Sequence, residues 1–120
     1  METSQEKLEQ GLMNLLLQGE HPILNILRQQ YASARVVSRS FTGYGFYTHY
    51  GILKTVPLVE PQNFAAGNVN IQLEGVLNGA GCVLFIRDGR LSFLECYTFD
   101  DPWPDQIMIK SLSEAIPAIP

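Results

Sequence analysis

Basic clusters, metal-ligand motifs and long apolar runs are all missing from this sequence. No stretch approaches the roughly 18 apolar residues of a membrane helix, and the first residues lack the basic region and apolar run of a signal peptide. The 8 Lys and Arg residues are scattered, and the formal net charge of -4 opposes binding to DNA or RNA. We therefore expect a cytoplasmic protein that binds neither nucleic acid nor membranes.

Cysteine and histidine are scarce as well. The chain has 2 of each, without the spacing of a zinc site, so we expect no metal and no cofactor. The sequence also lacks a glycine-rich phosphate loop and the glycine-framed serine of a nucleophile turn. Covalent catalysis and nucleotide chemistry have no support here, and the sequence favours a protein that is not an enzyme.

What is present fits one ordinary domain. The chain has 120 residues, of which 46% are hydrophobic and 17% charged, and this is enough to bury a core without disulfides. We predict a single α+β domain over residues 1–120. Its expected parts include an N-terminal helix within 1–20, a long loop at 54–68 and a C-terminal tail at 100–120.

Two helices are predicted at the N-terminal end. Thr3 and Glu6 have the spacing of a capping box, and apolar residues then recur at helical spacing, which predicts a helix over 4–18. Pro22 suits the first turn of a second helix, expected over 22–32.

Five runs rich in β-branched and aromatic residues follow, as expected of strands. They lie at 34–41, 46–53, 69–77, 82–86 and 91–99. With the helices, they predict an N-terminal helical pair packed on one face of a mainly antiparallel sheet of about five strands.

Two turn signals predict the register of the last three strands. The Asn-Gly pair at 78–79 and the Asp-Gly pair at 88–89 are typical two-residue hairpin turns. Counted from these turns, Leu84 faces Phe93, and Glu95 falls on the core face. The two cysteines, at 82 and 96, fall on opposite faces and should not form a disulfide.

A carboxylate on the core face is the first departure from the expected pattern. Its predicted neighbours, Gly75 and Cys82, have the smallest side chains of that layer, so we expect a small cavity beside Glu95. Acids with a perturbed pKa in cavities are candidate functional groups. The candidate catalytic residues are Glu95, His49 and Arg39. The candidate ligand-pocket residues are Glu95, Gly75, Cys82 and Tyr97. The alternative is a structural glutamate that reaches water or pairs with an arginine.

The opposite face of the predicted sheet is the second departure, because its centre is too apolar for full solvent exposure. Trp103 lies between two prolines that hold its ring in a defined direction, so that it either caps the core or is displayed to a partner. The candidate interface residues are Val83, Phe85, Leu94 and Trp103. This face could bind a protein partner, form a homodimer, or be covered by the loop and the tail.

Several motifs together resemble a family of small uncharacterised bacterial proteins. They are ARVVSR at 34–39, FTGYGF at 41–46, NGAG at 78–81, LFIRDGRL at 84–91, LECYT at 94–98 and PWP at 102–104. The resemblance spans 22–106 and implies a bacterial, cytoplasmic, single-domain protein. It implies no activity and no catalytic residue.

Three functions remain open from the sequence. The small size, the acidic charge and the apolar second face favour a non-enzymatic protein-interaction or regulatory module, for which a basic partner is expected. A small-molecule binder or minimal acid–base enzyme built on Glu95 is the first alternative. A structural homodimer is the second.

Overall fold

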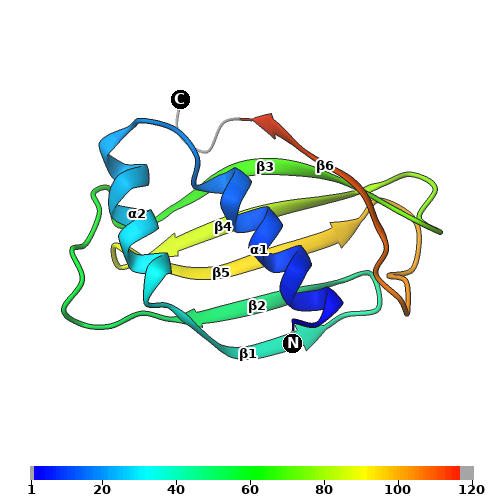
Figure 1. The fold of residues 1–120 in the computed structure, drawn as a ribbon, viewed down its shortest axis with the longest axis horizontal. Helices are drawn as coiled ribbons and strands as arrows, with labels where there is room; N and C mark the ends of the chain where they lie inside the picture. Colours follow the sequence, from blue (N-terminus) through cyan, green and yellow to red (C-terminus); the bar gives the residue numbers. More distant parts are fainter. Residues whose placement is uncertain (1, 117–120) are drawn as a thin grey trace.

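The computed structural model describes residues 2–116, which form two helices on one face of a six-stranded antiparallel sheet (Figure 1). The strand order is β1-β2-β5-β4-β3-β6. The elements are α1 Ser4–Leu16, α2 Pro22–Ala32, β1 Arg35–Phe41, β2 Gly45–Gly51, β3 Phe64–Leu73, β4 Ala80–Arg87, β5 Arg90–Thr98 and β6 Ile109–Ile116. The predicted α+β class is confirmed, with one more strand than expected. None of the helices in the described part is long and apolar enough to span a membrane.

Both helices begin where the sequence predicts. The Thr3 side chain accepts a hydrogen bond from the Glu6 backbone N–H, and the Glu6 carboxylate accepts one from the Thr3 backbone N–H, which confirms the capping box. Pro22 opens α2, and the His21 ring accepts from the N–H of Ile23. The apolar stripe of α1 lies on the sheet and carries the buried Leu8, Leu12, Met13 and Leu16.

The hairpin between β4 and β5 has the predicted turn. Asp88 and Gly89 have φ angles of 54° and 75°, and Ile86 pairs with Leu91 as expected. Beyond that pair the register shifts by one residue, because Ser92 is an extra residue in β5, a β-bulge.

The bulge reverses the predicted faces of β5. Leu84 pairs with Leu94, and not with Phe93 as predicted. Leu94, Cys96 and Thr98 are therefore buried under the helices, and Phe93, Glu95 and Tyr97 alternate with them on the other face. The prediction of Glu95 on the core face is wrong. The physical reason is the desolvation of a carboxylate, which this register avoids while it buries Leu94.

Cys82 lies on the core face as predicted, but the prediction of Cys96 on the opposite face is wrong. Cys82 and Cys96 pair directly across β4 and β5, and both are buried in the core as free thiols. Burial, together with the neighbouring Cys82, raises the pKa of the Cys96 thiol well above its usual value. The Cys96 thiol therefore stays neutral and packs as a small apolar side chain.

The predicted hairpin turn at 78–79 is wrong as well. β3 starts at Phe64, inside the predicted loop, and ends at Leu73, so a connection of several residues joins it to β4. Ile71, and not Leu77, pairs with Ala80. Gly75 lies in that connection with a φ of 81°, which favours glycine.

Part of the predicted C-terminal tail is the sixth strand. β6 pairs antiparallel with β3 along one edge of the sheet, where α1 also packs. Its sequence, IKSLSEAI, does not alternate strictly between apolar and polar residues, so the pattern of a strand is weak there. The end of the predicted tail, 117–120, lies outside the described residues.

The segment between β2 and β3 is anchored to the β4–β5 turn. The buried side chain of Gln30 on α2 donates to the carbonyls of Pro57 and Gly89, at 2.8 and 2.9 Å, and accepts from the N–H of Leu91 at 2.9 Å. Val59 is buried beside this turn and donates its N–H to the Gly89 carbonyl. One amide side chain thus joins a helix, a loop and a hairpin.

The shifted register predicts different costs for two neighbouring substitutions. Leu94→Ala should lower the free energy of unfolding by about 2 to 4 kcal/mol, because it leaves a cavity in the core. Phe93→Ala should lower it by less than about 1.5 kcal/mol, because its ring lies on the half-exposed face. Urea unfolding measures both values. The reverse order would contradict the bulge.

Candidate functional site

Glu95 lies on the helix-free face of the sheet, outside any core cavity. Its carboxylate accepts a hydrogen bond of 2.9 Å from the Tyr47 hydroxyl on the neighbouring strand β2. This hydrogen bond, together with the nearby charge of Glu95, raises the pKa of Tyr47. The predicted room above Glu95 is absent, because Cys82 lies on the opposite face and pairs with Cys96.

The predicted catalytic residues are not brought together. His49 shares the helix-free face with Glu95, but it pairs with Phe93, so the two are only diagonal neighbours. Arg39 extends to the helix side, where it pairs with Glu9. The predicted ligand pocket is not assembled either. Gly75 is exposed in the β3–β4 connection, while Tyr97 lies on the helix-free face opposite Gly81.

Two of the four predicted interface residues lie elsewhere in the fold. Leu94 has 0% of its surface exposed, because it belongs to the core under the helices. Trp103 packs edge-on against the buried ring of Phe46 at 5.3 Å, so it caps the core. Val83 and Phe85 are on the helix-free face, as predicted, and both are half-buried.

Aromatic rings form the centre of that helix-free face. Phe85 stacks on Phe93 with ring centroids 4.6 Å apart, and the rings of Tyr47 and His49 flank Phe93 at 6.0 and 5.2 Å. The Arg87 guanidinium lies over the Phe85 ring at 5.2 Å. We call this surface the aromatic face; its residues are Tyr47, His49, Val83, Phe85, Arg87, Phe93 and Glu95.

The rings come from three neighbouring strands, which the pairing explains. β5 lies between β2 and β4 in the sheet, so each residue of β5 on the helix-free face has a neighbour on both strands. Phe93 pairs with His49 on β2 and with Phe85 on β4. Because the bulge turned Phe93 outward, the row became continuous. Sequence reasoning missed Phe93 because of this bulge, and it missed Tyr47 because the pairing of β2 with β5 was not predicted.

Sequence reasoning also missed the buried carboxylate, which belongs to Glu9 on α1. Only 3% of Glu9 is exposed. It accepts from the Arg39 guanidinium at 2.6 and 2.7 Å, from the Thr48 hydroxyl at 2.6 Å and from the Gln5 amide at 3.0 Å. A signal exists in the sequence, because Glu9 lies on the apolar stripe of α1, three and four residues before two buried side chains.

The donors around Glu9 decide its chemistry. Burial would raise the pKa of this carboxyl, but the hydrogen bonds from Arg39, Thr48 and Gln5 outweigh it and lower the pKa below its usual value. Glu9 therefore stays ionised and has no proton to donate. The group ties α1 to β1 and β2, and this role is structural.

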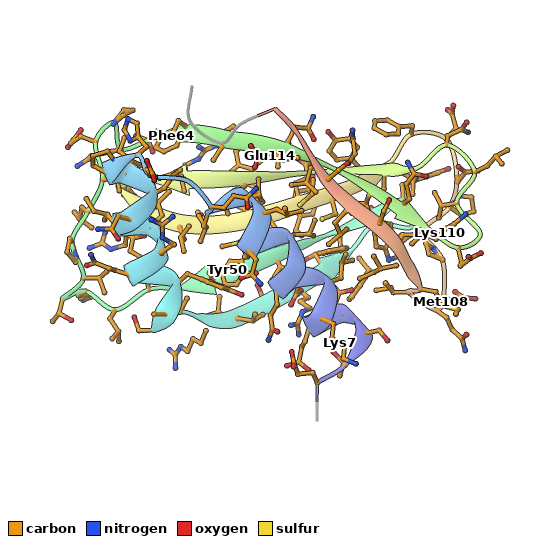
Figure 2. All side chains as sticks on the ribbon, turned by 45° about the horizontal axis from the view of Figure 1, so that its top comes forward. Lys7, Tyr50, Phe64, Met108, Lys110 and Glu114 are labelled. Atoms are coloured by element: carbon orange, nitrogen blue, oxygen red, sulfur yellow. The ribbon has the colours of Figure 1, made fainter. Side chains whose placement is uncertain are left out.

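A small cavity of about 220 Å³ lies next to this ion pair, between the two helices and the sheet. The rings of Tyr31 on α2 and Tyr50 on β2 line it, with their centroids 6.2 Å apart. Tyr50 is labelled in Figure 2. Among the described residues, the Tyr50 hydroxyl is buried without a hydrogen-bond partner, and its desolvation raises the pKa of Tyr50 strongly. The volume lies below the roughly 300 Å³ at which ligand pockets usually begin.

No protein-family model, curated protein sequence or solved structure matches this chain. Function is therefore inferred from the geometry of the two faces of the sheet.

Removing the cation beside Glu9 should destabilise the fold. We expect Arg39→Met to lower the free energy of unfolding at neutral pH by about 2 to 3 kcal/mol, because a buried carboxylate loses its charge partner while Arg39 itself is partly solvated. Arg35→Met, on the same strand and exposed, is the matched control, with an expected change within about 0.5 kcal/mol.

The pH dependence of these variants tests the cause. The folded-state pKa of Glu9 is lowered, so in the wild type this group stabilises the fold above its unfolded pKa, and the stabilisation is lost as the pH falls through the folded value. In Arg39→Met, the hydrogen bonds to Glu9 no longer outweigh the effect of burial on its pKa, and the Glu9 carboxyl can take up a proton. The difference in the free energy of unfolding between wild type and Arg39→Met should therefore shrink towards acid pH. A difference independent of pH would contradict this account.

Proposed function

We propose that this protein is a non-enzymatic interaction module whose binding surface is the aromatic face. The observation that carries the proposal is the row of rings across three strands, left without a covering helix while both helices lie on the opposite face. A sheet that carries apolar side chains on both faces is normally covered on both. A second protein chain would supply the missing layer.

The composition of the aromatic face supports this function. Aromatic residues and arginine are the side chains most enriched at the energetic centres of protein interfaces. Here the stacked rings of Phe85 and Phe93 lie at the centre, and Arg87 lies at their edge. Tyr and His rings beside them offer both apolar area and polar atoms, as partner-binding surfaces commonly do.

The charges indicate the chemistry of the partner. The Glu95 carboxylate is already engaged by the Tyr47 hydroxyl. The exposed Arg87 guanidinium donates to a backbone carbonyl and lies over two rings, and it has no carboxylate partner in the described part of the chain. A partner that places a carboxylate next to an apolar patch would pair with Arg87. We therefore propose an acidic partner surface, in place of the basic partner that the net charge alone suggests.

The interaction can be tested by affinity purification from cells of the source organism, followed by reconstitution with the purified partner. We expect Phe85→Asp to abolish binding, because it buries a charge among the rings, and Arg87→Glu to weaken it at least about tenfold. Leu77→Asp, at an 89% exposed position in the β3–β4 connection, is the matched control and should bind as the wild type does. Retention of every partner by Phe85→Asp and Arg87→Glu would contradict the proposal.

Self-association through the same face is the second candidate function. The observation that favours it is the presence of both signs of charge, Arg87 and Glu95, on one surface, since a twofold axis could pair each with its opposite on a second copy.

Light scattering over a range of concentrations tests this candidate. A dimer formed this way should dissociate in Arg87→Glu, because like charges then meet, and should re-form in the doubly exchanged Arg87→Glu, Glu95→Arg variant. A monomeric mass of the wild type at high concentration would dismiss the homodimer.

A further inference from the structure

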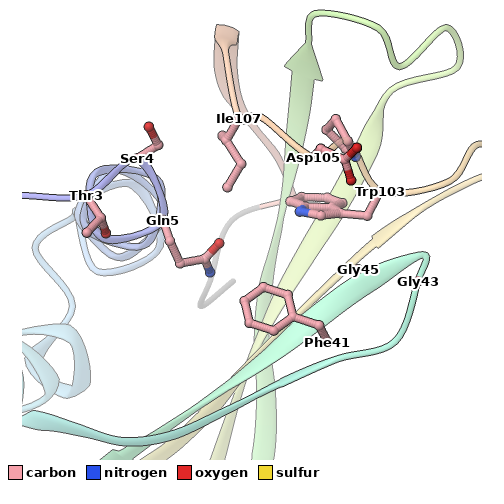
Figure 3. Close-up of a pocket in the computed structure, with 10 residues that line it drawn as sticks. Thr3, Ser4, Gln5, Phe41, Gly43, Gly45, Trp103, Asp105 and Ile107 are labelled. Carbon is pink, nitrogen blue, oxygen red and sulfur yellow. The ribbon is translucent and has the colours of Figure 1, made fainter.

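A pocket lies at the end of the sheet where α1 begins, and none of its lining residues belongs to the aromatic face. This pocket, of about 550 Å³, opens where the start of α1, the β1–β2 turn and the segment after β5 meet (Figure 3). Its volume is within the roughly 300 to 1,000 Å³ of pockets that bind small ligands. The residues that carry the argument are Gln5, Phe41, Trp103 and Asp105.

Backbone contacts hold the walls of this pocket in place. The Trp103 N–H donates to the Gly43 carbonyl at 2.8 Å, and the prolines on both sides of Trp103 restrict its backbone. At Gly45, an added Cβ would lie 1.8 Å from the carbonyl oxygen of Cys96. The close approach of these two strands depends on that glycine, which fixes the backbone at this wall of the pocket.

The pocket has aromatic walls. Phe41 and Trp103 lie across the pocket from each other (Figure 3), and each packs against the buried ring of Phe46, at 6.2 and 5.3 Å. Phe41 is 62% exposed, although its ring borders the pocket. Rings placed in this way favour a flat apolar group between them.

One polar atom of the pocket lacks a partner. The Gln5 amide nitrogen donates to the Glu9 carboxylate at 3.0 Å, and since a carboxylate only accepts, the Gln5 oxygen must point the other way. That oxygen is buried and has no hydrogen-bond partner among the residues that the structure describes. Figure 3 shows the Gln5 side chain entering the space between Phe41 and Trp103. Because water does not reach this oxygen in the structure, a ligand donor contacts it only when the Gln5 side chain or the exposed Phe41 ring shifts.

The charge of the lining restricts the ligand further. Asp105 is the one ionised side chain among the lining residues, and it is negative. At the start of α1, the Thr3 side chain already accepts from the Glu6 N–H in the capping box. An anionic ligand would be repelled by the Asp105 carboxylate, and the Glu6 N–H in the first turn of α1 is already hydrogen-bonded to Thr3. Phosphates and carboxylates therefore fit this pocket poorly.

We infer that this pocket binds a planar aromatic group that carries an O–H or N–H donor and is neutral or cationic, such as a phenol. The ring lies between Phe41 and Trp103, and its donor completes the hydrogen bonding of the Gln5 oxygen. This site is independent of the proposed function, since none of its lining residues belongs to the aromatic face.

The test compares two probes that differ only in the donor. Trp103 is the single tryptophan, so its fluorescence reports the binding of phenol and of anisole, the methyl ether without the O–H. We expect phenol to bind the wild type up to about tenfold more tightly than anisole, the usual upper value of one buried hydrogen bond. In Gln5→Met the ratio should fall to about one, because the acceptor is lost.

Controls separate this binding from a change in folding. Gln10→Met makes the same chemical change at an exposed position of α1 outside this pocket, and it should keep the wild-type preference. Phe41→Ser removes an exposed wall and should weaken both probes to a similar extent. Tyramine should bind more tightly than 4-hydroxyphenylacetate, because only the latter places a negative charge near Asp105.

Three results would overturn the inference. They are the absence of a saturable change in Trp103 fluorescence with phenol, equal binding of phenol and anisole by the wild type, and a preference for phenol that survives in Gln5→Met. A blocked Gly-Tyr-Gly peptide compared with phenol identifies the source of the ring. Tighter binding of the peptide supports a tyrosine side chain of another protein, and tighter binding of phenol supports a free small molecule.

Discussion

The cost of burying a carboxylate is the constraint on which the rest of this structure depends. Glu9 is buried because Arg39, Thr48 and Gln5 all donate to it, so the charge is compensated inside the fold. Those donors are engaged by Glu9, whereas Glu95 lies on the helix-free face, where it is only half-buried and accepts from the Tyr47 hydroxyl. One extra residue in β5 therefore turns Glu95 outward and turns Leu94 inward.

Both proposed surfaces follow from how these two carboxylates are placed. When the bulge turned Glu95 outward it also turned Phe93 outward, and this completed the row of rings on the aromatic face. On the helix side, Glu9 takes the nitrogen of the Gln5 amide and so directs the oxygen of that amide into the pocket beside Trp103. A partner-binding face and a ligand pocket thus lie on opposite sides of one sheet.

Local signals predicted well where their chemistry is local. The capping box at Thr3 and Glu6, the proline start of α2 and the Asp-Gly turn after β4 all form as expected, because each depends on contacts within a few residues. The Asn-Gly pair at 78–79 is a local signal that failed, because β3 ends at Leu73 and no two-residue turn forms there. The other failures arose at long range. One bulge at Ser92 changed the face of every later residue in β5, and the edge strand β6 carries too little apolar periodicity to be recognised. The candidate site built on Glu95 failed with the register, whereas Val83 and Phe85 were on the expected face.

The sequence by itself determined the α+β class, the two helices with their ends, and the first two strands, since capping, helical periodicity and β-propensity are properties of neighbouring residues. Only the tertiary structure decided which carboxylate is buried, which side of β5 faces the helices, and that Arg39 serves Glu9 and not Glu95. Those outcomes depend on competition between distant groups for donors and for space in the core. The physical reason is that desolvation is a property of the assembled fold, and no local pattern records it.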